Sequence, residues 1–138
     1  MAKARVLVLI VCLALFYPVR SSAYEADKLK SQVLYPNLYI KILKWSIYSV
    51  RGVAIVHHVT IENTGDLAYK NIRVRIHYLS GSYSNYGTSV AVTTGVLPIF
   101  VPPRSKNTYL KGGAVLGAGS SNFIPSAIEV LGATAVDP

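Results

Sequence analysis

The sequence predicts an all-β protein, namely an antiparallel β-sandwich of the immunoglobulin or fibronectin type with about six to seven strands, preceded by an N-terminal signal segment. Apolar and polar residues alternate along residues 53–78, which is the strongest pattern in the chain. No stretch after the leader has the apolar periodicity of a long helix. Turn-forming residues recur about every 8–12 positions, which is the spacing of short sandwich strands.

The N-terminal residues have the layout of a secretory signal peptide. A basic start with Lys3 and Arg5 precedes an apolar run over residues 6–17, and small residues follow up to Ala23. This apolar run is shorter than the roughly 20 residues that span a bilayer. We therefore expect cleavage after Ala23, with Ala26 as a second candidate site and retention as a membrane anchor as the alternative.

The single cysteine, Cys12, lies in the apolar run and leaves with the signal peptide. The exported protein would then have no disulfide, no thiolate metal site and no thiol nucleophile. Removal of the leader also takes Lys3, Arg5 and Arg20, which lowers the formal net charge from +8 to about +5. The remaining basic residues are scattered, which argues against a nucleic-acid partner. The positive charge is still compatible with binding to an anionic lipid, a wall polymer or an acidic protein. We expect a periplasmic or extracellular location.

The chain divides in this interpretation into a signal peptide at 1–23, a lead-in linker at 24–37 and a β-sandwich domain at 38–138. Residues 24–32 carry mostly charged and polar side chains, and they predict either a short helical turn or a flexible lead-in. Residues 38–50 are rich in Tyr, Ile, Trp and Val, which favours a first strand. A turn at Arg51-Gly52 ends that strand.

Residues 53–78 predict a hairpin of two strands joined by a polar turn at Asn63–Asp66. The alternation places His57 on the apolar face, so we expect a buried, hydrogen-bonded histidine there. His58 and His77 lie on the outer faces of their strands, opposite the apolar face. The residues expected to face the core are Val53, Ile55, Val59 and Ile61 on the first strand and Ile72, Val74, Ile76 and Tyr78 on the second.

Shorter strands are predicted beyond this hairpin. Residues 88–94 form one strand that Gly95 breaks, and residues 96–101 follow as an edge strand or bulge because Pro98 cannot donate a ladder hydrogen bond. The remaining expected elements are a turn at 102–105, a strand at 108–110, a flexible loop or glycine-bent strand at 112–119, and a last strand at 127–136.

Three short stretches resemble a known type of exported domain. Val59–Asp66 resembles the strand and Asn-Thr-Gly turn of the FxLYD-type domains, and Tyr69–Val74 is similar to the alternating strand that follows this turn. Pro102–Ser105 resembles the proline turn before a late strand in such domains. The late-embryogenesis-abundant-like sandwiches share the same general layout. The resemblance spans residues 45–136 and implies a β-sandwich without catalytic residues.

Two groups of side chains are candidate partner contacts. Arg73 and Arg75 lie on the solvent face of the predicted strand, where they either grip a carboxylate or phosphate or simply keep the sheet soluble. The loop at 80–87 is rich in Ser, Gly, Asn and Tyr, which is the composition of adaptable recognition loops. The alternative is a long hairpin connection whose tyrosines lie back on the sheet. The candidate contact residues of this loop are Tyr83, Asn85 and Tyr86.

The sequence predicts no cofactor, no metal site and no catalytic set. If Ile61 pairs with Ile72, His58 lies diagonal to His77 on one face, but a metal site needs at least a third ligand. The neighbouring arginines would also repel a cation. The chain has no Gly-x-Ser-x-Gly elbow, and no nucleophile stands beside a base in a recognisable pattern. We therefore expect a protein that is not an enzyme.

These observations lead to one functional hypothesis and one alternative. The hypothesis is an exported, non-enzymatic β-sandwich module that mediates protein binding or scaffolding in the cell envelope. Its partner would be another extracytoplasmic protein or envelope component, with membrane contact only if the N-terminal segment is retained. The alternative is a subunit of a surface polymer or fibre assembled by sheet-edge strand addition, with residues 24–37 as the donor strand.

Overall fold

The computed structural model describes residues 22–120 and 122–137 of the 138-residue chain, which divides into two compact units, Met1–Ser31 and Gln32–Pro138. Residues 1–21 lie outside the described part, and with them most of the predicted signal peptide and Cys12. Cleavage of the leader and export therefore stay predictions. Residues 22–34 are helical, where the sequence left a short helical turn or a flexible lead-in open.

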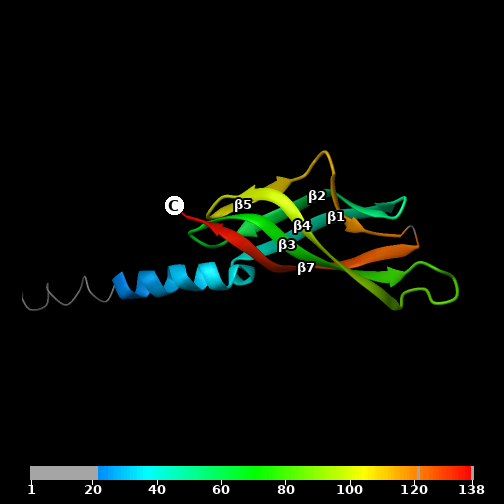
Figure 1. Cartoon of the computed structure of the whole chain (residues 1–138), viewed down its shortest axis with the longest axis horizontal. Coiled ribbons are helices and arrows are strands. Elements are labelled where there is room, and N and C mark those ends of the chain that lie inside the picture. Colours follow the sequence, from blue (N-terminus) through cyan, green and yellow to red (C-terminus); the bar gives the residue numbers. More distant parts are fainter. Residues whose placement is uncertain (1–21, 121, 138) are drawn as a thin grey trace, which may run out of the picture. The chain divides into compact units, whose positions relative to one another are not determined.

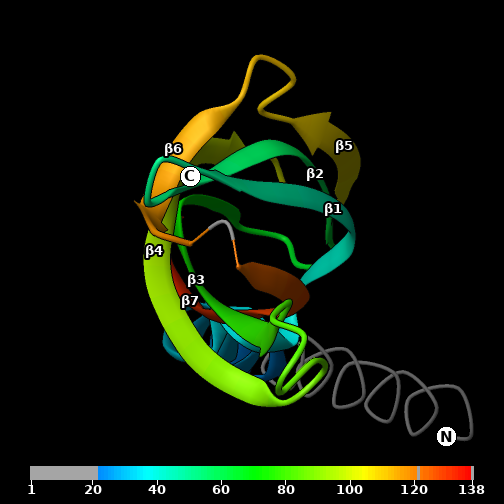
Figure 2. The ribbon, with the colours of Figure 1, turned by 90° about the vertical axis from the view of Figure 1, so that its right-hand side faces the viewer.

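The second unit is an all-β sandwich, which confirms the predicted fold class (Figures 1 and 2). In its described residues, seven strands form two antiparallel sheets after a short 3₁₀ turn, η1 (Pro36–Leu38). Sheet A has the order β1-β2-β5, with β6 also paired to β2, and sheet B has the order β4-β3-β7. The strands are β1 (Ile40–Val50), β2 (Val53–Asn63), β3 (Ala68–Ser80), β4 (Ser89–Val101), β5 (Ser105–Tyr109), β6 (Ala114–Ala118) and β7 (Phe123–Val136).

β1 and β2 form a tight hairpin through the predicted turn at Arg51-Gly52. Val50 pairs with Val53, and both turn residues have positive φ, +49° at Arg51 and +79° at Gly52. Two consecutive positive φ values are typical of a type I′ turn, whose twist matches that of an antiparallel pair. The predicted first strand is thus confirmed, and it begins at Ile40 because η1 occupies the residues before it.

The predicted hairpin of β2 with β3 is wrong, because the two strands belong to different sheets (Figure 2). The segment between them carries the chain across the sandwich. Its buried Asn63 side-chain amide donates to the carbonyl oxygens of Leu67 at 2.8 Å and Pro102 at 2.9 Å. The Asn63 Oδ1 accepts from the N–H of Gly65 at 2.9 Å. Both strands alternate because their apolar faces meet across the core, and two strands paired side by side would show the same pattern.

A bulge in β2 makes the expected buried histidine wrong, since His57 is exposed. His58 pairs with Ser46 and Val56 with Ile47, which leaves His57 without a partner on β1. The extra residue reverses the alternation of the strand. Neither β5 nor β6 pairs with β2 at this point. The core-facing residues are Ala54, Val56, Val59 and Ile61, in place of the predicted Val53, Ile55, Val59 and Ile61.

The alternation predicted for β3 is confirmed. The residues expected to face the core are all buried, namely Ile72, Val74, Ile76 and Tyr78. Asn71 has a φ of +52° and lies at a register shift between β3 and β4. Asparagine is one of the few residues that tolerate this left-handed conformation. The irregularity lets Tyr69, three residues before Ile72, also point into the core.

β4 is one continuous edge strand, so the predicted break at Gly95 is wrong and the predicted edge position of Pro98 is confirmed. A Cβ atom at Gly95 would collide with the side chain and carbonyl oxygen of Leu116 on β6. Nearby, the Thr93 hydroxyl donates to the carbonyl oxygen of Ala118 at 3.3 Å. Small inward residues on β4 therefore let sheet B approach β6 of sheet A closely.

The last three strands follow the predicted order with shifted ends. The predicted turn at 102–105 leads into β5, which begins at Ser105. The glycine-rich stretch at 112–119 contains β6, which corresponds to the glycine-bent strand of the two predicted alternatives. β7 begins at Phe123, earlier than predicted, because Pro125 is tolerated in a strand at the edge of its sheet.

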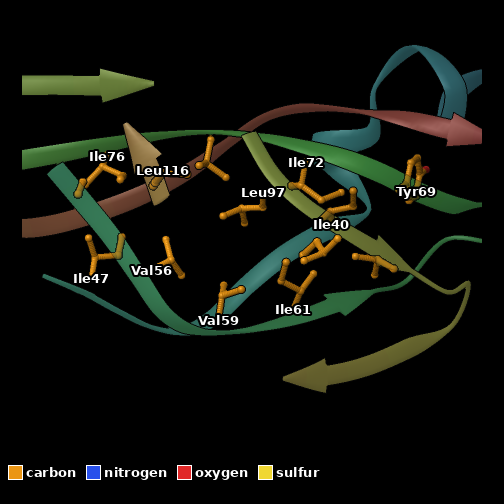
Figure 3. Close-up of a cluster of buried hydrophobic side chains, with 14 of the residues drawn as sticks. Ile40, Ile47, Val56, Val59, Ile61, Tyr69, Ile72, Ile76, Leu97 and Leu116 are labelled. Carbon is orange, nitrogen blue, oxygen red and sulfur yellow. The ribbon is translucent and has the colours of Figure 1, made fainter. Parts of the chain in front are cut away.

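The hydrophobic core lies between the two sheets (Figure 3). Sheet A and sheet B each contribute a row of aliphatic side chains, and Leu116 of β6 joins them. Fully burying a side chain of this size contributes about 1.5–3 kcal/mol. The largest contributors that the figure labels are Ile40, Ile47, Val56, Val59 and Ile61 from sheet A and Tyr69, Ile72, Ile76 and Leu97 from sheet B.

Gln32 holds the crossing between β2 and β3 in place. Its fully buried side-chain Oε1 accepts from the N–H of Asp66 at 2.5 Å and from the N–H of Leu67 at 3.1 Å. The hydroxyl of buried Tyr69 donates to the Gln32 carbonyl oxygen at 3.0 Å. Burial, with smaller contributions from Tyr39 and Asp66, raises the pKa of Tyr69 to about 12. Side chains from other parts of the chain therefore hold the segment between β2 and β3 in place.

Candidate functional site

The loop between β3 and β4 is closed at its base by backbone hydrogen bonds (Figure 1, the green loop after β3). The N–H of Ser80 donates to the Thr88 carbonyl oxygen at 2.8 Å, and the N–H of Gly87 donates to the Ser80 carbonyl oxygen at 2.9 Å. The N–H of Gly81 donates to the Asn122 carbonyl oxygen at 2.7 Å. The loop is thus anchored both to itself and to the segment that precedes β7.

Asn85 organises the interior of this loop. Its side-chain Oδ1 accepts from the Ser80 hydroxyl at 2.6 Å. Its backbone carbonyl oxygen accepts from the Thr88 hydroxyl at 2.8 Å. The Ser80 Oγ in turn accepts from the N–H of Ser82 at 3.1 Å. The structure therefore places Asn85, a predicted contact residue, in the hydrogen-bonded framework of the loop.

Tyr83 and Tyr86 point outward from that framework. Their relative exposures are 106% and 71%, so neither ring lies back on the sheet. Together with Gly81 they line a hollow of about 330 Å³. Tyrosine combines a large apolar ring with a hydroxyl, and both become available to a partner when the side chain is exposed. These two predicted contact residues therefore share one surface with a recess that can receive a side chain.

Arg73 and Arg75 lie on the outer face of β3, away from the loop. Arg75 Nη1 contacts Glu129 Oε1 on β7 at 2.8 Å, and His77 Nε2 lies 3.5 Å from the same oxygen. Arg73 extends over Gly132, where a Cβ atom would meet its guanidinium at 2.6 Å. Ser80 follows Arg75 by five positions, which is about 16 Å along a strand. The predicted contact residues thus form two surfaces rather than one.

The outer face of β4 is apolar, a surface that was not predicted from the sequence. Val92, Val96 and Phe100 are 57%, 47% and 53% exposed. The strand presents them outward because its small residues, including Gly95, face β6. The sequence pattern that could have predicted this surface is the run Thr93-Thr94-Gly95 amid valines. Small residues on one face of a strand indicate close approach of another element.

The histidines are arranged differently from the predicted pair of His58 with His77. His58 lies in sheet A and His77 in sheet B, so the pairing on which that prediction rested is absent. His57 and His58 contact each other instead, with their Nδ1 atoms 3.0 Å apart. Which Nδ1 donates and which accepts depends on the tautomers of the two rings. Across the described residues, no three His, Cys, Asp or Glu side chains gather in a cluster that could hold a metal ion.

Comparison with known proteins gives little. No protein-family model matches the chain, and no curated protein sequence matches it. Among solved structures, the chain is similar to the Salmonella enterica trimeric lipoprotein SadB, with 12% sequence identity and a TM-score of 0.38, over 94% of this chain and 80% of that one. Within residues 22–120 and 122–137, no helix has both the length and the apolar character needed to cross a bilayer.

Proposed function

We propose that the protein is an exported, non-enzymatic β-sandwich module that binds or scaffolds another protein of the cell envelope. The loop at 81–87 forms the contact. The exported location rests on the predicted signal peptide at 1–23. The observation that carries the contact is the pair of outward-pointing rings, Tyr83 and Tyr86, on a loop that is closed by its own hydrogen bonds.

The internal hydrogen bonds of the loop favour binding because they lower its entropic cost. Ordering a flexible loop on binding costs conformational entropy, and a loop already held by internal hydrogen bonds loses less. Tyrosine has only two side-chain torsions, so fixing Tyr83 and Tyr86 against a partner costs little further entropy. The hollow that they line with Gly81 is large enough for one partner side chain. Tyrosine is one of the residue types that are enriched among binding hot spots.

Two acidic side chains of the sandwich form ion pairs with arginines. Glu129 forms an ion pair with Arg75 on the outer face of sheet B. Asp66 forms an ion pair with Arg104 at 2.6 Å beside the crossing between the sheets. These two residues therefore serve the fold.

The fibre alternative requires residues 24–37 to act as an extended donor strand. Residues 22–34 are helical and residues 36–38 form η1, so this segment would have to unfold before it could add to a sheet. The buried Gln32 would also have to leave Asp66 and Leu67. Nothing in the arrangement favours that exchange, and we give preference to the binding module.

The test is affinity purification of the tagged full-length protein from the envelope of its source organism after mild cross-linking. The comparison is between the wild type, the double variant Tyr83→Ser/Tyr86→Ser, and the matched control Tyr48→Ser. Tyr48 is an exposed tyrosine on β1 of the other sheet, 43% exposed. We expect a specific protein to co-purify with the wild type and the control, and at least about tenfold less of it with the double variant, as for loss of hot-spot residues.

Two outcomes would contradict the proposal in different ways. Equal recovery of the same partner with the double variant would show that the contact lies elsewhere on the module. Failure of the wild type to retain any envelope protein would argue against a protein-binding function altogether.

A further inference from the structure

The outer face of sheet B carries a row of apolar side chains along its edge strand. Every second residue of β4 from Val90 to Phe100 is exposed, so these residues share the face that points away from the core. Four of them are large and apolar, namely Val90, Val92, Val96 and Phe100. β4 lies at one end of the strand order of sheet B. Apolar side chains gathered in a row, rather than scattered singly, mark a surface that another body covers.

Cationic side chains of β3 lie directly beside this row. In the register of the two strands, Lys70 pairs with Phe100 and Arg73 pairs with Val96. All four of these residues are exposed. Directly opposite residues of two antiparallel strands have Cβ atoms about 4.5–5.5 Å apart. Each of the two apolar side chains therefore has a cation at the distance of one neighbouring strand.

The strands of sheet B carry an excess of positive charge. Among the residues of β3, β4 and β7, Lys70, Arg73 and Arg75 stand against one carboxylate, Glu129. Arg75 Nη1 already holds that carboxylate at 2.8 Å. Within the described part of the chain, no carboxylate lies within ion-pair distance of Lys70 or Arg73. These two cations are therefore available to anions from outside the sandwich.

We propose that the outer face of sheet B docks on an anionic lipid surface. The apolar row of β4 enters the boundary between headgroups and acyl chains, while Lys70 and Arg73 contact lipid phosphates. A bilayer has an apolar layer directly below a layer of phosphates, so it matches both rows at once. A second copy of the same face would instead bring its own excess of positive charge against this one. The inference goes beyond the proposed binding function and does not depend on the loop at 81–87.

An environment-sensitive fluorophore reports which face meets the lipid. The protein is purified from cells that express the full-length chain in a Cys12→Ser background, which removes the only native cysteine. The fluorophore is attached at Val92→Cys on β4 or, as the matched control, at Tyr48→Cys on β1 of the other sheet. With vesicles of phosphatidylcholine that contain about 30% anionic phosphatidylglycerol, we expect a blue shift of the emission from position 92 and none from position 48. Equal shifts at both positions, or no shift at position 92, would overturn the proposal.

Charge reversal tests the two free cations in a vesicle-binding titration. A Lys or Arg near an anionic lipid surface strengthens binding about fivefold, so Lys70→Glu/Arg73→Glu should weaken binding by about 25-fold or more. The matched control is Lys106→Glu/Lys111→Glu, which makes the same change of net charge at exposed positions on and after β5 of the other sheet. We expect the control to weaken binding by less than about threefold. Equal losses for the two double variants would overturn the assignment of this face.

Two further measurements separate lipid from other occupants. A blue shift at position 92 with polyglutamate but not with anionic vesicles would assign the face to an acidic protein and overturn the lipid proposal. A shift that grows with protein concentration in the absence of vesicles would assign the face to a second copy and overturn it as well. Tyr83→Ser/Tyr86→Ser should bind vesicles as the wild type does, so failure of the proposed protein contact leaves this result unchanged.

Discussion

Tyr69 places a phenol where water does not reach, with its hydroxyl on the carbonyl oxygen of Gln32. Burial raises the pKa of Tyr69 from 10.0 to about 12, so the folded chain holds its proton over a pH range in which the unfolded chain releases it. The stabilisation from this group is therefore complete below pH 10, and it is lost as the pH rises from about 10 towards 12.

The Tyr69→Phe variant separates the contribution of the hydrogen bond to Gln32 from that of the raised pKa. At pH 8, loss of the hydrogen bond to Gln32 should lower the free energy of unfolding by about 1 kcal/mol. Between pH 10 and about 12 the wild type should lose more stability than the variant, because the variant has no buried phenol to ionise. Urea unfolding at pH 8, 10 and 11 measures both, and parallel pH profiles for the two proteins would contradict the assignment.

Gly95 on β4 lies directly against Leu116 on β6 of the other sheet. Gly95→Ala should lower the free energy of unfolding by about 1–3 kcal/mol, because its Cβ would meet Leu116 on β6. Gly112→Ala is the matched control, since a Cβ atom at Gly112 meets nothing within 4 Å. We expect the control to change stability by less than about 0.5 kcal/mol. Equal urea midpoints for the two variants would contradict the close approach.

Among the elements, the strands whose alternation is uninterrupted could be predicted from the sequence. β3 shows this clearly, since Ile72 to Tyr78 alternate as predicted. β2 could not be read in the same way, because its bulge at His57 reverses the faces and no residue type marks a bulge uniquely. Strand pairing was harder still. β2 and β3 face one another across the core, and alternation alone does not distinguish strands of opposing sheets from strands of one hairpin.

Only part of the candidate site could be predicted from the sequence. Composition identified the loop around Tyr83 and Tyr86, because its residue types are those of recognition loops. The structural role of Asn85 depends on a hydrogen bond with Ser80, which composition does not specify. The separation of Arg73 from the loop depends on the length and direction of β3, which follow from the fold.

The β1–β2 hairpin offers a test at the scale of one element. Arg51 has a φ of +49°, which costs energy for an arginine, and Arg51→Asn should raise the free energy of unfolding by about 0.5–1 kcal/mol because asparagine suits the first position of a type I′ turn. Gly52→Ala should instead destabilise by more than about 1 kcal/mol, since Gly52 has a φ of +79°. A destabilising Arg51→Asn in urea unfolding would contradict the turn type.

At the scale of the whole molecule, the sandwich keeps its two candidate contact surfaces apart. Tyr83 and Tyr86 are exposed on the loop after β3, and the Arg75–Glu129 ion pair lies on the outer face of sheet B.

Site-specific photo-cross-linking in living cells tests directly whether the loop at 81–87 binds an envelope protein. A photoreactive phenylalanine analogue replaces Tyr83, and in a matched control it replaces Lys106, an exposed residue on β5 of the other sheet. We expect a discrete cross-linked product with an envelope protein from position 83 and none from position 106. A product from position 106 alone, or none from either position, would contradict the assignment of the loop as the binding site.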